Sequence, residues 1–232
     1  MKTTRIKNLL ILVFLMADLA LGIILYTDYV SSTQPGREEI DAVVTLLEQR
    51  GVVLNPMLLT GSARHIPALT LRISPAGDEN GNIFFSEQTE EALTENFARA
   101  FMQSKNICTD FMFLSEIKEN SLTFREAYHG IELVHSYITF SLEHEQLTVS
   151  GRLYIPEISE AESTMRVQHA VPALMEFCRE PALPPKATIT ELSLGYAEYL
   201  SSEDSAYSEG SGIAVWKIKL NNGNTYIYEA GN

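Results

Sequence analysis

Side chains that could act as nucleophiles or bases are scattered along this sequence, and none falls in a recognisable catalytic motif. His135 and Ser136 are neighbours in a segment that alternates like a β-strand, so their side chains point to opposite faces and cannot form a dyad. Gly210 to Gly212 (GSG) lies in a polar stretch that is typical of a flexible loop, and no G-x-S-x-G is present. We therefore do not expect a serine hydrolase.

Paired carboxylates raise the alternative of a glycosidase, which needs two acids at a fixed separation in a cleft. Here the pairs fall at the starts of predicted helices, where the helix dipole favours acids, or in a predicted turn. These pairs are Glu38 with Glu39, Glu90 with Glu91, and Glu143 with Glu145. No glycine-rich phosphate loop is found, and the histidines and cysteines lack metal-ligand spacing. We predict a protein that is not an enzyme, with no cofactor and no metal.

Two cysteines, Cys108 and Cys178, leave two interpretations open. Outside the cell they could form one disulfide that closes a loop of roughly 70 residues, for which chain entropy would contribute about 4 kcal/mol. Each cysteine also lies in an apolar stretch, NICTDFMF and LMEFC, which favours two small buried hydrophobic residues instead.

Composition indicates a folded, acidic protein. The chain has 232 residues with a formal charge of −13, and 45% of its residues are hydrophobic. That apolar content is too high for a disordered chain, and the negative charge argues against a nucleic-acid-binding surface.

The apolar run from Leu9 to Tyr26 predicts a single membrane-spanning helix. About 18 residues at ~1.5 Å each give ~27 Å, enough for the hydrocarbon core. Lys2, Arg5 and Lys7 precede the run and acids follow it, so the positive-inside rule places the N-terminus in the cytoplasm and the rest outside the cell. The competing interpretation is a signal peptide cleaved after small residues such as Ala20 and Gly22, which would leave an apolar start.

Asp18 lies near the middle of this run, where a carboxylate costs ~2.5–3.5 kcal/mol on insertion scales. Because one helix offers Asp18 no partner of its own, we predict a contact with a transmembrane helix of another molecule. The alternative is a polar residue tolerated by an otherwise sufficient anchor.

The part after the anchor shows mixed helical and strand periodicities. Residues 37–50 and 88–104 have the apolar spacing of helices, with Leu93, Phe97, Ala100 and Phe101 facing inward in the second. Three successive strands over 121–156 predict a meander with one buried face, which in the second strand holds Val134, Ile138, Phe140 and Leu142. A further helix is expected over 158–178, then a proline-rich break at 179–186. Asn221 to Asn224 between two apolar runs predicts a final hairpin, with Trp216 as a core anchor.

These elements predict an α+β protein, with one transmembrane helix followed by two small α+β modules in tandem. The predicted division is a cytoplasmic tail (1–8), the transmembrane helix (9–26), a connector (27–36), a first module (37–112) and a second module (113–232).

Four stretches together resemble the YycH/YycI family, and the shorter YycI type most of all. They are RIKNLLILVFLMADLALGIILY, EQRGVVLNPMLL, YHGIELVHSYITFSLEHEQLTVSGRLYIP and AVWKIKLNNGNTYIYEA. The last is similar to the Trp-containing hairpin of PepSY-like modules, which implies antiparallel PepSY-like sheets. The chain ends at Asn232 without the longer tail of some relatives, which would make the last module abbreviated.

The resemblance implies a regulatory rather than a catalytic role. YycI-like proteins sit on the outer face of the cytoplasmic membrane of Gram-positive bacteria and modulate the sensor histidine kinase of a two-component system, partly through the anchor helix. The implied partners are that kinase and a second, YycH-like protein, and Asp18 would supply a polar contact between helices. The alternative function is a PepSY-like extracytoplasmic module that inhibits a protease or binds a cell-wall ligand.

Overall fold

A computed structural model describes residues 13–26, 35–59, 64–78, 80–107, 110–158, 164–199 and 209–231. The fold is mixed α+β, and one large sheet dominates it. Besides a helix over residues 13–26, its helices are α2 (Arg37–Gln49), the short 3-10 helix η1 (Pro56–Leu59), α3 (Glu95–Ser104) and α4 (Val171–Phe177). Its strands are β1 (Val52–Leu54), β2 (Arg64–Pro67), β3 (Leu69–Ile73), β4 (Asn82–Gln88), β5 (Met112–Lys118), β6 (Ser121–Tyr128), β7 (Ile131–Glu143), β8 (Gln146–Arg152), β9 (Tyr154–Ile158), β10 (Thr164–Val167), β11 (Ala187–Tyr199), β12 (Glu209–Leu220) and β13 (Thr225–Glu229).

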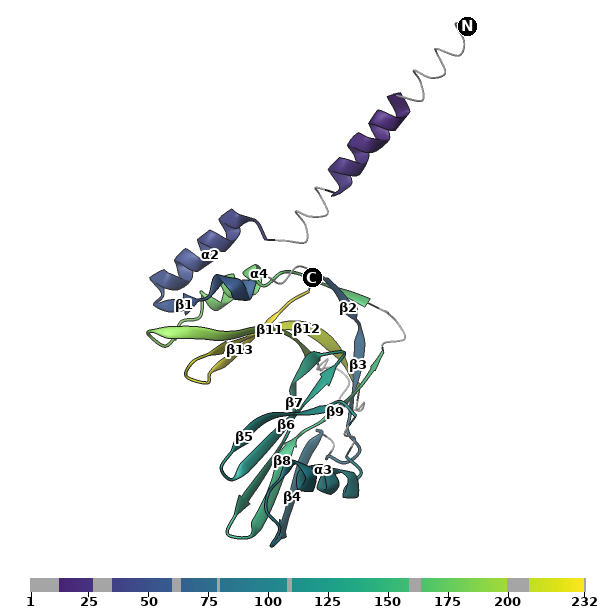
Figure 1. The fold of residues 1–232 in the computed structure, drawn as a ribbon, viewed down its shortest axis with the longest axis vertical. Coiled ribbons are helices and arrows are strands. Elements are labelled where there is room, and N and C mark those ends of the chain that lie inside the picture. The colour runs from purple at the N-terminus through teal and green to yellow at the C-terminus, as the bar shows by residue number, and fades with distance from the viewer. Residues whose placement is uncertain are drawn as a thin grey trace, which may run out of the picture.

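The large sheet has 11 strands and runs through two lobes that Figure 1 shows one above the other. The α3 lobe holds β4, β8, β7, β6 and β5, all antiparallel to their neighbours, with α3 packed on one face. The α2–α4 lobe holds β1, β11, β12, β13, β3 and β9, with α2 and α4 packed on one face. The lobes join where β7 pairs in parallel with β11, at Glu132 with Gly195 and Leu133 with Tyr196.

The core of the α3 lobe combines residues on both sides of position 112. Ile83 from β4 and Met102 from α3 share one hydrophobic cluster with Phe124, Phe140 and Val149 of the meander. Phe101 meets Phe140 edge to face, with ring centroids 5.7 Å apart, in the geometry that aromatic pairs prefer. β4 and α3 therefore pack with the strands that follow them in the sequence.

The α2–α4 lobe is built from the segments before and after the α3 lobe. Val43 and Leu47 of α2 pack with Leu174 and Phe177 of α4 against Ile218 of β12. Trp216 is 8% exposed, and its indole Nε1–H donates a hydrogen bond to the carbonyl of Gln168. The predicted role of Trp216 as a core residue is confirmed.

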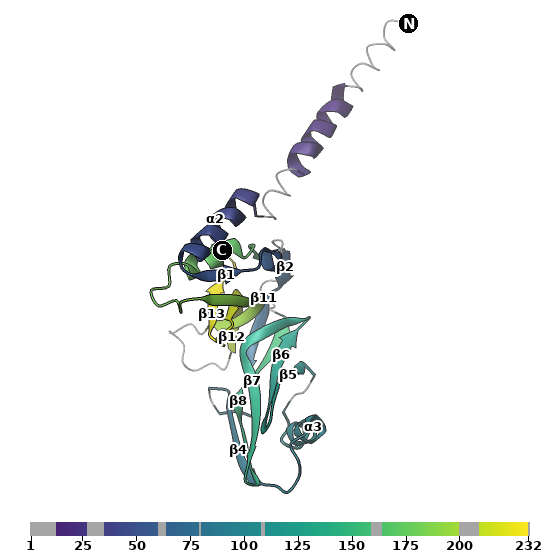
Figure 2. The same cartoon turned by 60° about the vertical axis from the view of Figure 1, so that its left-hand side comes forward.

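The sheet bends within β7, and the pairing of β6 with β7 gives the cause. Arg125 pairs with Tyr137, and Ala127 pairs with Glu132. One residue, Glu126, separates these pairs on β6, whereas four residues separate them on β7. This irregularity reverses the alternation of β7, so that Leu133 faces the core of one lobe and Ile138 the core of the other. Figures 1 and 2 show the bend from two sides.

Most of the predicted elements are present. The first helix, the meander and the final hairpin are confirmed, and Gly223 in the hairpin turn has a φ of 89°, which glycine adopts without strain. Val134, Ile138 and Phe140 are buried as predicted, whereas Leu142 is only half-buried.

The predicted helix over 158–178 is wrong for most of its length. Thr164–Val167 forms β10, which pairs with β2 in a separate two-stranded sheet, and α4 begins only at Val171, with Pro172 in its first turn. The apolar spacing of this stretch resembled a helix because it joins an edge strand to a short helix.

The second predicted helix is also shorter than expected: β4 continues to Gln88 and α3 begins at Glu95, with Thr94 as its N-cap. In α3, Ala98 rather than Ala100 faces the core.

Residues 13–26 form a helix that stands away from both lobes in Figure 1, and every one of these residues is exposed. Residues 9–12 of the predicted transmembrane span lie outside the described residues. Among the residues that are described, no helix has both the length and the apolar character to cross a membrane.

Candidate functional site: the groove on the uncovered face of the sheet

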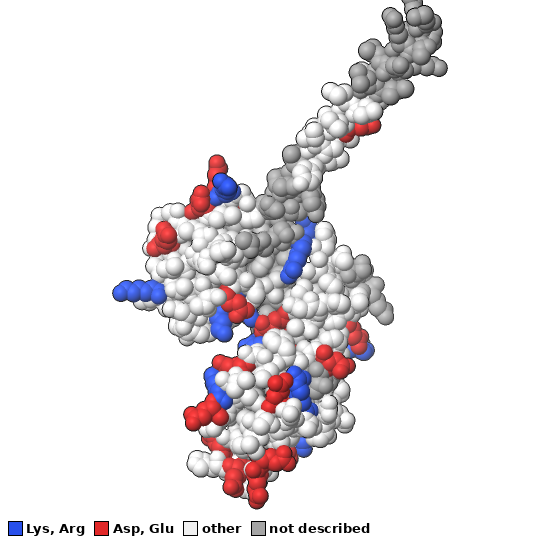
Figure 3. Space-filling model, in the orientation of Figure 1, with Lys and Arg blue, Asp and Glu red and all other residues white. Residues whose placement is uncertain are grey.

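The helices cover only one face of each lobe, and the opposite face carries a groove at the bend. Alternation along β12 places Ile218 against α2 and α4, while Lys217 and Lys219 point to the other side. The groove has a volume of about 550 Å³, and residues of β5, β6, β7, β11, β12 and β13 line it. In Figure 3 the hollow between the lobes is bordered by side chains of both charge signs.

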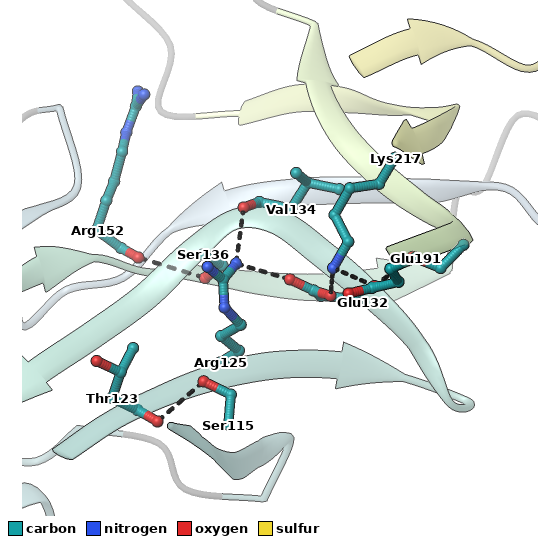
Figure 4. A network of polar contacts seen from close by, with 10 residues as sticks. Ser115, Thr123, Arg125, Glu132, Val134, Ser136, Arg152, Glu191 and Lys217 are labelled. Atoms are coloured by element: carbon teal, nitrogen blue, oxygen red, sulfur yellow. Dashed lines mark hydrogen bonds and ion pairs between the residues drawn. The ribbon is translucent and has the colours of Figure 1, made fainter. Parts of the chain in front are cut away.

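Lys217 is the centre of an ionic cluster on the floor of this groove. It is only 7% exposed, and its Nζ lies 2.8 Å from Oε1 of Glu191 and also contacts Glu132. Nη1 of Arg125 donates a 2.7 Å hydrogen bond to Oε1 of Glu132 and a longer one, 3.5 Å, to the carbonyl of Val134. Figure 4 shows these four charged side chains converging from β6, β7, β11 and β12. Four strands from both lobes are thereby linked through one set of charges.

Glu191 is ionised in this cluster. Burial disfavours the charged carboxylate, but hydrogen bonds from Lys217 and Ser193 outweigh it and lower the pKa of Glu191 below its ordinary value. The cluster has two positive side chains, Lys217 and Arg125, and two negative ones. Its formal charges therefore balance.

A second polar group lies at the bend, behind the groove. Glu126 is 2% exposed and accepts hydrogen bonds from Ser136 Oγ and from the backbone N–H of Tyr154, the latter at 3.3 Å. Burial raises the pKa of Glu126 to about 7, because these two neutral donors compensate only part of the lost hydration. Ser136 also donates to the carbonyl of Arg152 at 3.4 Å, so this small network ties β6, β7 and β8 together where the sheet turns.

A third contact set joins the α3 lobe to the end of β11. Arg152 lies 3.2 Å from the carboxylate of Glu198 and 5.1 Å from the ring centroid of Tyr154, while the Tyr154 hydroxyl donates to the same carboxylate. Burial, together with the hydrogen bond to Glu198, raises the pKa of Tyr154 above its ordinary value. On the groove side, burial and then the charge of Arg152 lower the pKa of His135.

The polar side chains at the groove lie on opposite faces of β7 or are paired with each other. His135 is exposed and Ser136 is fully buried, which confirms that these neighbours face opposite sides of β7. The acidic and basic side chains on the floor are paired with each other, and Glu191 also accepts a 2.7 Å hydrogen bond from the hydroxyl of Ser193. Among the described residues, no group of three His, Cys, Asp or Glu side chains could hold a metal ion.

Of the residues singled out from the sequence, His135 lines the groove, whereas Asp18 and Cys178 do not. Asp18 lies in the exposed helix of residues 13–26. Cys178 caps the C-terminal end of α4, where burial raises the pKa of its thiol. Cys108 lies outside the described residues, so the disulfide between Cys108 and Cys178 stays a prediction.

Sequence reasoning missed the charged residues of the groove. Glu132, Glu191 and Lys217 are far apart in the chain, and only the pairing of β7, β11 and β12 brings them together. One signal was present: Lys217 interrupts the apolar run GIAVWKIKL, and a lysine inside a buried strand needs a partner.

The described residues thus form one bent sheet, with helices on one face and a groove lined by paired charges on the other. No protein with a curated function matches the chain. The structure of an uncharacterized protein from Eubacterium rectale is similar at 12% identity and a TM-score of 0.35, over 62% of this chain and 55% of that one. The sequence model of the YycI protein family matches residues 76–230. The chain therefore belongs to the YycI family, a family of regulatory accessory proteins of two-component systems.

Proposed function

We propose that this protein is a membrane-anchored accessory protein that modulates a two-component sensor histidine kinase from outside the cell. Membership of the YycI family, with a match that spans both lobes, is the observation that carries the proposal. The mode of action is non-enzymatic, which agrees with a groove whose charged groups are paired with each other.

The proposed topology is a single pass with the N-terminus in the cytoplasm and both lobes outside. The basic residues before Leu9 and the 18-residue apolar run support it, as does the separation of the helix of residues 13–26 from the two lobes. Proteolysis of intact cells tests this topology directly. Loss of the lobes with retention of a short membrane-bound stub is expected, and full protection of the lobes would contradict it.

Within the membrane, the proposed contact is Asp18 with a polar group on a helix of the kinase or of a YycH-like partner. Hydrogen bonds between transmembrane helices contribute ~0.6–2 kcal/mol each, so Asp18 tunes an association that other contacts share. Outside the membrane, the groove is the proposed docking surface for the kinase or the YycH-like partner, because it is the recess in which exposed Lys219 and partly exposed Glu191 remain accessible.

Co-purification from native membranes tests the function, with the bound proteins identified by mass spectrometry. The full chain is expected to retain a histidine kinase. Asp18→Leu, and separately Lys219→Glu in the groove, are each expected to retain less of the kinase than the unaltered chain. Lys186→Glu makes the same change of charge at an exposed position between α4 and β11 and serves as the matched control. Absence of any histidine kinase with the unaltered chain contradicts the proposal, and a peptidase as the sole partner favours the alternative of a protease inhibitor.

A further inference from the structure

The uncovered face of the α3 lobe displays three aromatic rings that the core does not use. Phe84 on β4 is 69% exposed, Tyr137 on β7 is 41% exposed and Phe113 on β5 is 40% exposed. Alternation places all three on the side opposite α3, because their neighbours Ile83, Ile138 and Met112 point into the core. We call this side of β4, β8, β7, β6 and β5 the hydroxyl–aromatic face.

The register of the strands sets the spacing of these rings. Tyr137 pairs with Arg125, which pairs with Phe113, so the two rings share one row and lie two strands apart, roughly 10 Å. Phe84 pairs with Ser150, which pairs with Thr139, two residues along β7 from Tyr137. The second interval is therefore roughly 12 Å. The three rings follow a path across the strands that is offset by two residues at Phe84, at nearly even intervals.

Hydroxyl groups occupy the two rows next to the row of Tyr137, whereas Arg125 lies between Tyr137 and Phe113. The row of Phe84 continues through Ser150, Thr139 and Thr123, and the next row consists of Ser86, Thr148, Ser141 and Ser121. Each hydroxyl can donate one hydrogen bond and accept others. Thr123 and Thr139 contact each other at 3.1 Å, while Ser150 at the centre of the face is exposed.

The charges on this face are neutralised locally. Arg125 is paired with Glu132, Arg152 with Glu198, and Lys118 with Glu116. A nucleic acid would need unpaired basic side chains, which these pairings do not offer. Protein–protein interfaces are enriched in aromatic residues, arginine and methionine and depleted in serine, so the three rings alone would suit a protein partner, whereas the rows of serine hydroxyls beside them do not. The balanced charge of this face suits a polymer that carries many hydroxyl groups and few charges.

We propose that the hydroxyl–aromatic face binds a linear glycan chain. Sugar rings present flat C–H faces that pack on aromatic rings and hydroxyl groups that exchange hydrogen bonds with serine and threonine. The rings at Phe84, Tyr137 and Phe113 are placed to hold sugars at intervals along one chain. The inference rests on the proposed function only in that the lobes lie outside the cell, where such polymers occur.

Co-sedimentation tests the proposal, with the full chain in detergent micelles and two insoluble probes. The probes are Gram-positive peptidoglycan sacculi and chitin, and the soluble glycan strands that an amidase releases from the sacculi serve as the competitor. The unaltered chain is expected to sediment with both, and the soluble strands are expected to reduce its sedimentation. Phe84→Ala combined with Tyr137→Ala is expected to weaken binding about tenfold, because each ring contributes stacking as well as buried area.

Two controls keep the outcome interpretable. Val53→Ala removes an equally exposed apolar side chain from β1 in the other lobe, and Tyr137→Phe keeps the ring while removing its hydroxyl. Both are expected to bind within about twofold of the unaltered chain, since stacking depends on the ring. Because the substituted side chains are exposed, thermal unfolding of all variants should be unchanged, which separates lost binding from lost structure.

Three results would overturn the proposal. They are absence of sedimentation with both probes, unchanged binding after removal of the two rings, and sedimentation with sacculi that the soluble glycan strands do not reduce. If the double variant still sediments but no longer retains the kinase, the face is a protein interface instead. Failure of the kinase co-purification alone leaves the sedimentation result standing, so the two proposals fail independently.

Discussion

Ser136 donates a hydrogen bond to the carboxylate of Glu126 at the bend of the sheet, and both side chains are almost completely buried. Both residues fall in the irregular pairing of β6 with β7, where one residue on β6 faces four on β7. A carboxyl group fits this position because it can accept from the serine hydroxyl and from the N–H of Tyr154 together. The bend that creates the groove therefore depends on a titratable side chain.

Stability should fall as the pH rises through neutrality because of Glu126. Its pKa is raised from 4.5 in the unfolded chain to about 7 in the folded one, so the folded state binds more protons between these values. The stabilising contribution is complete below pH 4.5 and is lost as the pH rises through 7, about 3 kcal/mol in all. Urea unfolding at pH 5 and pH 8, followed by the fluorescence of Trp216, measures the difference.

Glu126→Gln isolates this effect, because glutamine keeps an oxygen that accepts from Ser136 but cannot ionise. The variant should lose most of the pH dependence between 5 and 8. Glu116→Gln, at an exposed position on β5, should leave it unchanged. An unaltered pH profile in Glu126→Gln would show that another group titrates.

Lys217→Ala should destabilise the protein by about 3 kcal/mol. The substitution leaves Glu132 with Arg125 as its remaining partner and takes away the closest cation of Glu191. Lys118→Ala removes an exposed lysine paired with Glu116 and should cost less than about 1 kcal/mol. Equal losses of stability in the two variants, measured by urea unfolding, would mean that the groove cluster stabilises the protein no more than an exposed ion pair does.

Gly195→Ala should weaken the joint between the lobes. A Cβ at this position would lie 2.5 Å from Cγ2 of Val134 and 3.0 Å from the carbonyl of Glu132, so β7 would have to move away from β11. Overpacking of this kind costs about 1–3 kcal/mol. Gly231→Ala meets only the carbonyl of Arg166 at 3.4 Å and serves as the control. Amide hydrogen exchange should show faster exchange at the β7–β11 joint in Gly195→Ala alone.

Local patterns predicted the elements that are stabilised locally. The turn at Asn221 to Asn224 has its own preferred conformation, and the alternation of Ile138 and Phe140 with polar residues reports a strand segment with one buried face. The same reasoning failed over 158–178, because β10 is fixed by pairing with β2, almost a hundred residues earlier in the chain. Apolar spacing contains no information about such a distant partner.

The candidate groove could not be predicted from the sequence for the same reason. Lys217 faces Glu132 only because β7 runs parallel to β11, and a parallel pairing between strands so far apart leaves no local signal. Glu126 shares the inward face of β6 with Leu122 and Phe124, so alternation alone predicts its burial. The bend was missed because the irregular pairing of β6 with β7 leaves no signal in the sequence.

Trp216→Phe should cost about 2–4 kcal/mol, although the replacement is also aromatic. The indole N–H donates to the carbonyl of Gln168 at 3.1 Å, just before α4, and phenylalanine would leave that carbonyl without this donor and a void beside Ala173 and Ala214. Because Trp216 is the single tryptophan of the chain, the emission of the unaltered protein should be shifted to the blue and should move to longer wavelength on unfolding. The stability of the variant itself is measured by circular dichroism. If Trp216→Phe unfolds at the same urea concentration as the unaltered chain, the contact between β12 and the segment before α4 is not a source of stability.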